Sequence, residues 1–207
     1  MPPAFIYFDL GNVIFFFDRD RAFRRMAEVS GVDATRVGDV VMRGGLQQAL
    51  ERGEIDWGDF HAEFSRRTGS QSDPAMLARA ASDMFQLNVD MVPLVAACGG
   101  AGIPLGILSN TCDPHWRFLA AGDHCILHGT FREIVLSHEV GMAKPDRRIY
   151  ELAASRADVE PSRIFFCDDL PEHVAAARAA GWDAELFTSA RLLADPRSRR
   201  GLPLTGC

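Results

Sequence analysis

Three short apolar runs in this sequence each end in polar side chains that could do chemistry. These side chains are, in chain order, Asp9, Ser109, Asn110, Asp168 and Asp169. An ionised carboxylate at the end of a buried strand loses its hydration, so it is retained only where a cation or hydrogen-bond donors meet it. Because ligands of open parallel sheets bind at the carboxyl ends of the strands, we expect these groups to form one site.

A lysine, Lys144, lies between the second and third of these runs. Three carboxylates brought together repel one another unless a divalent cation lies among them, and a set of oxygen ligands suits Mg²⁺ completed by water and a substrate phosphate. The hydroxyl of Ser109 and the ammonium of Lys144 are donors that a phosphoryl group needs. The residue types therefore favour phosphate chemistry at a magnesium site.

Strands and helices alternate from residue 89 onward, which is typical of a doubly wound parallel sheet. A first strand is predicted from Phe5 to a bend at Gly11-Asn12. The other predicted strands are Ile103–Leu108, Phe131–Leu136, Arg163–Cys167 and Ala184–Phe187, and the predicted helices are 91–98, 113–121, 146–156 and 172–180. Such a sheet would place the polar ends of its strands along one edge.

Residues 16–88 have a different pattern, in which charged and apolar residues alternate with helical period and no strand is predicted. The predicted helices are Arg19–Val29, Arg36–Met42, Leu46–Glu51, Trp57–Arg67 and Pro74–Phe85. We therefore expect an α/β protein whose doubly wound, Rossmann-like core comprises residues 1–15 and 89–207. A helical cap domain, residues 16–88, would be inserted into that core.

The composition argues against several classes of protein. The 207 residues are 47% hydrophobic, which allows a sizeable core, and the net charge of −6 argues against nucleic-acid and anionic-membrane partners. No run approaches the ~20 apolar residues needed to span a bilayer, and no basic leader precedes the first run. The five cysteines lack a Cys-x-x-Cys pair, which is typical of a reduced, cytoplasmic protein. Nothing in the sequence implies a protein partner.

The motifs occur in an order that resembles the haloacid dehalogenase-like superfamily. They are Asp9-Leu10-Gly11-Asn12-Val13, Ser109-Asn110-Thr111, Lys144-Pro145 and Asp168-Asp169, and the helical insert is similar to the type-1 cap of that superfamily. The resemblance implies that Asp9 is the nucleophile that takes the phosphoryl group as an aspartyl phosphate. It also implies that Asp9, the backbone carbonyl of Gly11 and Asp169 hold Mg²⁺, while Asp168 supports these ligands.

The same resemblance implies how the phosphate is held. Ser109 would hydrogen-bond the phosphoryl oxygens with Asn110 beside it. Lys144 would neutralise charge on Asp9 and on the group in transfer. The implied reaction is Mg²⁺-dependent hydrolysis of a small phosphorylated metabolite.

Gly11 departs from the pattern of the superfamily's phosphatases, which usually carry there a second aspartate that protonates the leaving oxygen and later activates water. A placed general acid or base contributes ~10²–10⁴-fold, and Gly11 keeps only the backbone carbonyl. Asn12 cannot replace the acid, because an amide has no proton to give near neutral pH, but it tolerates the positive φ expected there.

The Asp-Leu-Gly-Asn-Val form resembles a bacterial branch that includes α-D-glucose-1-phosphate phosphatases, as does Glu51-Arg52-Gly53-Glu54-Ile55. An anomeric phosphate leaves more easily than an alkyl phosphate, because its oxygen is the less basic alkoxide. The absence of an acid at position 11 would matter less for such a substrate, so a sugar 1-phosphate is a candidate.

His173 is a second departure, because the superfamily usually carries Asp or Asn there. Its imidazole could orient Ser109 or Lys144, relay a proton, or point to solvent from the start of a helix. Three polar residues of the predicted cap, Arg43, Gln47 and Arg52, are interpreted as surface residues rather than substrate contacts.

Two other functions stay open. One is a protein that binds a phosphorylated metabolite but has lost turnover with the acid at position 11. The other is a 2-haloacid dehalogenase, in which Asp9 displaces halide without a metal. The pair Asp168-Asp169 argues against the dehalogenase, since that chemistry needs no carboxylates around a cation.

Overall fold

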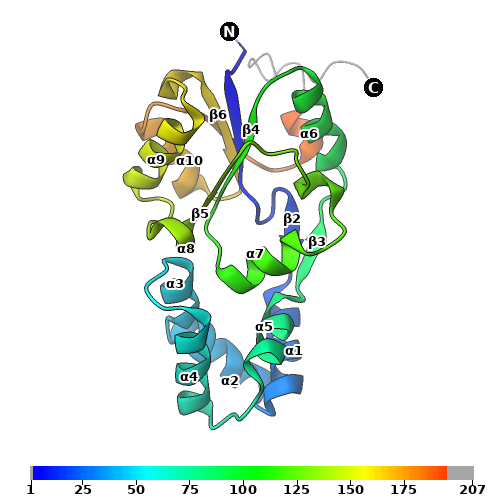
Figure 1. The fold of residues 1–207 in the computed structure, drawn as a ribbon, viewed down its shortest axis with the longest axis vertical. Helices are drawn as coiled ribbons and strands as arrows, with labels where there is room; N and C mark the ends of the chain where they lie inside the picture. The colour runs from blue at the N-terminus through cyan, green and yellow to red at the C-terminus, as the bar shows by residue number, and fades with distance from the viewer. Residues whose placement is uncertain (1, 195–207) are drawn as a thin grey trace.

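The computed structural model describes residues 2–194 and centres on a five-stranded sheet with the order β5-β4-β1-β6-β7 (Figure 1). The strands are β1 (Phe5–Phe8), β4 (Leu105–Ser109), β5 (Glu133–Leu136), β6 (Ile164–Asp168) and β7 (Asp183–Leu186). All neighbouring pairs are parallel, so the five carboxyl ends lie along one edge. The predicted doubly wound sheet is confirmed. Residues 195–207, the end of the predicted core, lie outside the described residues.

Helices cover both faces of this sheet. They are α6 (Met91–Gly100), α7 (Asp113–Ala120), α8 (Ser137–Val140), α9 (Arg147–Ala157), α10 (Pro171–Ala179) and α11 (Ala190–Leu193), with short 3₁₀ turns at Cys125–Leu127 and Pro161–Arg163. In β1, Phe5 and Tyr7 pack into the core with α9 and α10, while Ile6 and Phe8 pack into the core with α6 and α11. Because both faces of β1 are buried, its four residues are apolar or aromatic without alternation.

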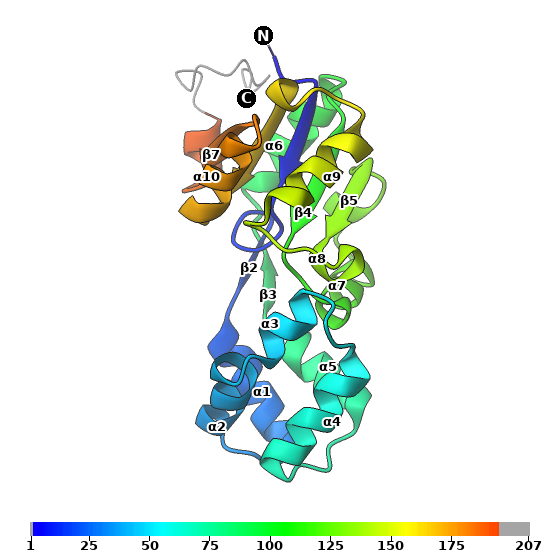
Figure 2. The ribbon, with the colours of Figure 1, turned by 90° about the vertical axis from the view of Figure 1, so that its left-hand side faces the viewer.

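A separate group of helices precedes α6 in the chain. Its members are α1 (Arg19–Ser30), α2 (Ala34–Gly38), a π-helical turn (Asp39–Arg43), α3 (Leu46–Glu51), α4 (Trp57–Thr68) and α5 (Pro74–Ser82). These helices share an apolar core and gather at one end of the molecule (Figures 1 and 2). Within residues 2–194, no helix is long and apolar enough to cross a membrane.

A short antiparallel ribbon lies between this helical group and the sheet (Figure 2). In it, β2 (Phe15–Phe17) pairs with β3 (Phe85–Leu87). The prediction that residues 16–88 contain no strand is therefore wrong, and the helix predicted to reach Phe85 ends at Ser82. Strands of three residues are too short to show a period of two, so the helical pattern on either side obscured them.

The segment after α3 packs closely against the sheet-bearing part of the chain. Ser137 is fully buried; its hydroxyl donates to the carbonyl oxygen of Glu51 at 2.5 Å and accepts from the backbone N–H of Thr111 at 2.9 Å. Gly53 has a φ of +66°, and a Cβ built there would lie 2.4 Å from the carbonyl oxygen of His138. These contacts fix the end of α3 against the loop that follows β4.

Candidate active site

The carboxyl ends of three strands bring the predicted carboxylates together. Asp9 follows β1, Asp168 is the last residue of β6, and Asp169 comes next. Oxygen atoms of these three side chains lie within 4.8 Å of one another. Residues far apart in the sequence therefore meet at one edge of the sheet. Their roles as nucleophile and metal ligands stay predictions.

Lys144 lies among these carboxylates and is only 3% exposed. Its Nζ is 2.9 Å from Asp9 Oδ1 and 2.5 Å from Asp168 Oδ2, and it donates to the carbonyl oxygen of Leu108 at 2.9 Å. The three N–H bonds of the ammonium are thus all used. Burial alone would lower the pKa of Lys144, but the charges of Asp9 and Asp168 outweigh burial and raise it. Lys144 therefore stays charged and fixes the position of Asp9.

The two carboxylates that contact Lys144 differ in how readily they ionise. Burial raises the pKa of Asp9 to about 6, although Lys144 opposes that shift. Burial also works against ionisation of Asp168, but Lys144 and His173 outweigh it and lower the pKa of Asp168 to about 2. Asp168 therefore stays ionised and holds Lys144. A further positive charge would stabilise the ionised form of Asp9 more than that of Asp168.

His173 lies in the first turn of α10 and is 5% exposed. Its Nδ1 is 3.0 Å and 3.1 Å from the two carboxylate oxygens of Asp168. The alternative in which His173 points to solvent is wrong. Within the described residues no hydrogen bond joins His173 to Ser109 or Lys144, so it reaches Lys144 only through Asp168.

Asn110 is hydrogen-bonded to the backbone of Lys144. Its Nδ2 donates to the carbonyl oxygen of Lys144, and its Oδ1 accepts from the backbone N–H of Lys144, both at 2.8 Å. This pair of bonds uses both ends of the amide. The Asn110 side chain therefore positions Lys144. It also lines the pocket, so its predicted place beside the phosphate stays a prediction.

Other groups at this edge are left open toward a ligand. Ser109 is 2% exposed, and its Oγ has no hydrogen-bond partner among residues 2–194. No hydrogen bond from those residues reaches the carbonyl oxygen of Gly11 either. Asn12 has the predicted positive φ, at +54°, and its Nδ2 donates to Asp169 Oδ2 at 2.8 Å. The other carboxylate oxygen of Asp169, Oδ1, takes no part in the hydrogen bond with Asn12.

This donor set fits a hard divalent cation. Three carboxylates lie close together and one buried ammonium contacts two of them, so the site keeps an excess of negative charge that a cation would relieve. The open groups are oxygens, which Mg²⁺ prefers. The residues that could hold the ion are Asp9, Asp169 and, through its carbonyl, Gly11.

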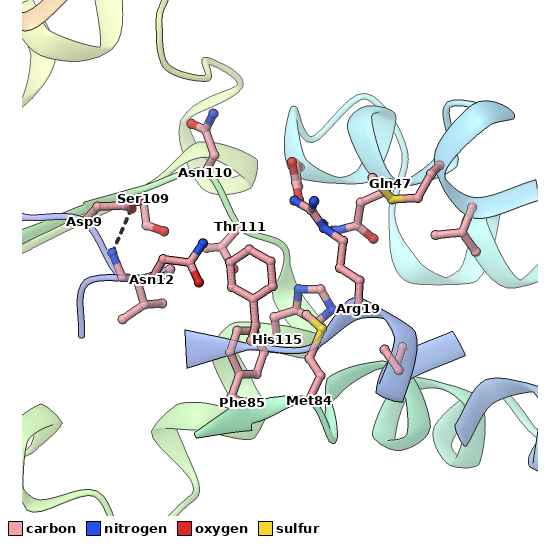
Figure 3. A pocket seen from close by; sticks show the side chains of 18 of the residues that line it. Asp9, Asn12, Arg19, Gln47, Met84, Phe85, Ser109, Asn110, Thr111 and His115 are labelled. Atoms are coloured by element: carbon pink, nitrogen blue, oxygen red, sulfur yellow. Dashed lines mark hydrogen bonds between the residues drawn. The ribbon is translucent and has the colours of Figure 1, made fainter. Parts of the chain in front are cut away.

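The site opens into a pocket of about 330 Å³ between the sheet and the helical group (Figure 3). Asp9, Asn12 and Ser109 lie on the sheet side of it, and Arg19 and Gln47 on the helical side. Much of the remaining lining is apolar and comes from the helical group, including Phe23, Met26, Val41, Phe60 and Ala81. The volume is near the lower end for ligand pockets, which favours a small ligand.

Sequence reasoning missed four polar residues of this lining, which are Arg19, Gln47, Glu51 and His115. The interpretation of Gln47 as a surface residue is wrong, whereas Arg43 and Arg52 lie outside the lining. Gln47 Nε2 donates to Glu51 Oε1 at 2.8 Å across one turn of α3. Their spacing of four residues on one predicted helix is the signal that could have paired them.

The ring of Phe17 fills the space beside Gly11. A Cβ at position 11 would lie 3.0 Å from Phe17 Cε1, which is closer than side chains normally approach. The guanidinium of Arg19 lies 5.0 Å from the centre of the same ring. An acidic side chain at position 11 would therefore have to displace Phe17.

Comparison with known proteins gives several relatives of modest identity, two of which are named as phosphatases of small sugar or polyol phosphates. A D-ribitol-5-phosphate phosphatase of Bacteroides thetaiotaomicron is 26% identical over 191 residues, which cover 86% of this chain and 88% of that protein. A glyceraldehyde 3-phosphate phosphatase of Methanopyrus kandleri is 27% identical over 126 residues, which cover 56% of this chain and 52% of that protein.

Among solved structures, the fold is similar to that of a HAD family enzyme from Bacteroides thetaiotaomicron in complex with magnesium and inorganic phosphate. The TM-score is 0.78 at 20% identity, over 89% of this chain and 93% of that one. The sequence model of the haloacid dehalogenase-like hydrolases matches residues 6–181, which include all four motifs at the edge of the sheet. The chain therefore belongs to the haloacid dehalogenase-like hydrolase family.

Proposed function

We propose that this protein is a Mg²⁺-dependent phosphatase that hydrolyses a small phosphate monoester through a phosphorylated Asp9. The observation that carries the proposal is the position of Asp9. It is tied to Lys144 at 2.9 Å and lies within 4.8 Å of Asp168 and Asp169, at the mouth of a small pocket. Such a carboxylate is held in place, partly desolvated and next to a cation site, as nucleophilic catalysis requires.

Each residue then has a task in the reaction. Lys144 holds Oδ1 of the Asp9 carboxylate, so that the other oxygen can attack phosphorus. The bond from phosphorus to the ester oxygen then breaks, and the alcohol leaves. Ser109 donates its unpartnered hydroxyl to a phosphoryl oxygen. Water then attacks the phosphorus of the aspartyl phosphate, which releases inorganic phosphate and restores the Asp9 carboxylate. When bound by Asp9, Asp169 and the Gly11 carbonyl, Mg²⁺ would neutralise charge on the phosphoryl oxygens.

The helical group, with the predicted bounds 16–88, would act as a cap over this site. Arg19, Gln47 and Glu51 line the pocket opposite the carboxylates, so the cap would contact the part of the substrate beyond the phosphate. The two relatives act on a ribitol phosphate and a glyceraldehyde phosphate, which supports a small phosphorylated metabolite as substrate. A sugar 1-phosphate is the candidate that best tolerates Gly11.

A phosphate-release screen over small monoesters, including sugar 1-phosphates, tests the proposal. EDTA is expected to lower release by roughly 10²-fold or more, because the cation stabilises charge in transfer, and Mg²⁺ should restore it. Mg²⁺ should also raise the melting temperature of the wild type but not that of Asp169→Asn, since ligands stabilise the state that binds them. Binding without phosphate release, or halide release from a 2-haloacid in EDTA, would contradict the proposal.

Replacing Gly53 with alanine is expected to loosen the contact between cap and sheet. The new Cβ would lie 2.4 Å from the carbonyl oxygen of His138, so the segment after α3 must move away. We expect the free energy of unfolding to fall by about 1–3 kcal/mol, as for overpacked sites, and KM to rise.

Gly31→Ala is the matched control for this variant. Gly31 ends α1 with a φ of +69°, close to that of Gly53, but nothing lies within 4 Å of a Cβ built there. It should lose stability through backbone strain alone and keep its KM. Equal KM values for Gly53→Ala and Gly31→Ala, measured beside urea unfolding of each, would show that the contact with His138 does not matter.

A further inference from the structure

The reaction proposed above needs a proton donor for the leaving oxygen, and the structure shows why position 11 cannot supply it. Gly11 has no side chain, and the ring of Phe17 lies beside it, 3.0 Å from a built Cβ. The neighbouring Asn12 is an amide that donates to Asp169. A proton donor must therefore come from another element of the pocket.

Among the described residues that line the pocket, few others titrate. The guanidinium group of arginine serves in proteins as a hydrogen-bond donor and not as an acid, so Arg19 is not a candidate. Burial lowers the pKa of His115 to about 4, so its ring is neutral near pH ~7 and has no acidic proton to give. His173 is bound to Asp168 through Nδ1. The remaining carboxyl group that is not part of the proposed cation site is that of Glu51.

Hydrogen bonds hold both the backbone and the side chain of Glu51. On the backbone, its carbonyl oxygen accepts from Ser137, whose hydroxyl also accepts from the N–H of Thr111, two residues after Ser109. On the side chain, Oε1 accepts from Gln47 at 2.8 Å. Oε2 has no hydrogen-bond partner among residues 2–194 and is left for a ligand. The carboxyl group is thus held at the pocket rather than free to swing into solvent.

The surroundings of Glu51 favour a protonated carboxyl group. Burial raises the pKa of Glu51, and the hydrogen bond from Gln47 and the charges of Arg19, Arg52 and Lys144 offset burial only in part. The thiol of Cys112 also faces it, with a pKa that burial raises to about 12, so that neighbour is uncharged. A general acid works best when its pKa lies nearer the working pH than that of an ordinary carboxyl group.

We infer that Glu51, supplied by the cap, is the general acid and base that replaces the side chain absent at position 11. When Asp9 attacks phosphorus, the bond from phosphorus to the leaving oxygen breaks and the Glu51 proton passes to that oxygen. The products are an alcohol, the aspartyl phosphate and the Glu51 carboxylate. The carboxylate then takes a proton from the attacking water, which releases phosphate and restores both side chains.

This inference rests on the proposed function and is tested by Glu51→Gln with two substrates that differ in their leaving group. The expected kcat/KM for glycerol phosphate falls roughly 10²-fold or more, because an alkoxide cannot leave without a proton. For p-nitrophenyl phosphate, kcat/KM should fall by less than about fivefold, because its phenolate leaves as a stable anion. Glutamine keeps the size of the side chain and can still accept from Gln47.

A second measurement tests the step in which water hydrolyses the aspartyl phosphate. Without the Glu51 carboxylate, the aspartyl phosphate should decay slowly, so labelled phosphate should accumulate on Glu51→Gln during turnover of p-nitrophenyl phosphate, whose first step is nearly unaffected, and be released by hydroxylamine. Glu51→Asp keeps the acid on a shorter side chain and should recover part of the glycerol phosphate activity. Glu54→Gln is the matched control, since Glu54 lies three residues later, is exposed and, within residues 2–194, forms an ion pair only with Arg52 at 3.7 Å.

The outcomes separate this inference from the proposed function. An equal loss on both esters would assign Glu51 to substrate binding, and no loss on either would remove it from the reaction; each result overturns the inference. If Asp9→Asn is inactive in the same assays, the proposed function survives that failure. If the wild type hydrolyses neither ester nor any of the monoester panel, both fail together.

Discussion

Phosphate release is expected to fall roughly 10⁴-fold or more in Asp9→Asn, because the variant lacks the group that attacks phosphorus. An amide oxygen is a poor nucleophile and cannot form the acyl phosphate. Asparagine has the size of aspartate, and its oxygen can still accept from the backbone N–H of Leu10, which donates to Asp9 Oδ1 at 2.7 Å. The fold should therefore be retained while turnover is lost.

Two measurements check this result. Phosphate release is followed in both proteins, and labelled phosphate is sought on the denatured protein as a hydroxylamine-sensitive bond, which only the wild type should form. Asp90→Asn serves as control, because Asp90 precedes α6 without a side-chain hydrogen bond to the helix. Turnover by Asp9→Asn near the wild-type rate would remove Asp9 as the nucleophile.

The sheet and its polar edge could be predicted because their signals are local and strong. β1, β4 and β6 are short apolar runs that end in Asp9, Ser109 and Asp168, and the rule that ligands bind at the carboxyl ends of parallel strands brings these ends together. The helix over 46–51 was predicted at its observed bounds because its apolar spacing and flanking turns agree.

What the sequence could not predict depends on contacts between distant segments. The pairing of β2 with β3 joins two three-residue strands from opposite ends of the helical insert. The approach of Phe17 to Gly11 follows from that ribbon, since Phe17 is the last residue of β2. No spacing rule connects such pairs, so the close approach of Phe17 to position 11 could not be predicted from the sequence.

The roles of some side chains at the site could not be predicted from the sequence for a related reason. The resemblance placed Asn110 beside Ser109 at the phosphate but gave no sign that its amide holds the backbone of Lys144. Glu51 lies in the stretch that resembles the glucose-1-phosphate phosphatase branch, but its place at the pocket depends on tertiary contacts such as that of its carbonyl oxygen with Ser137. Motifs name the residues of a site, whereas tertiary contacts decide which atoms face the ligand.

Replacing Lys144 with methionine should have the largest effect on stability. The change keeps most of the side chain's volume but leaves the buried carboxylates of Asp9 and Asp168 without their shared cation, and removal of one partner of a buried ion pair costs about 3–5 kcal/mol. Phosphate release should also fall by roughly 10²-fold or more, since Asp9 loses the group that positions it. Urea unfolding without Mg²⁺ and phosphate release with Mg²⁺ measure the two effects.

The pH dependence of this stability loss tests its electrostatic origin. In the wild type the pKa of Asp168 is lowered to about 2, whereas an unfolded aspartate has a pKa of ~3.9. The pairing of Asp168 with Lys144 therefore stabilises the fold fully above the unfolded-state pKa. This stabilisation is lost as the pH falls through about 2. In Lys144→Met the unpaired carboxylates should bind protons more readily, so the loss should be largest near pH ~7 and shrink toward pH ~4. Arg148→Met, which breaks only the exposed pair with Asp146, should stay close to the wild type at both pH values. A loss for Lys144→Met that does not change between the two pH values would mean that lost packing, and not uncompensated charge, destabilises the variant.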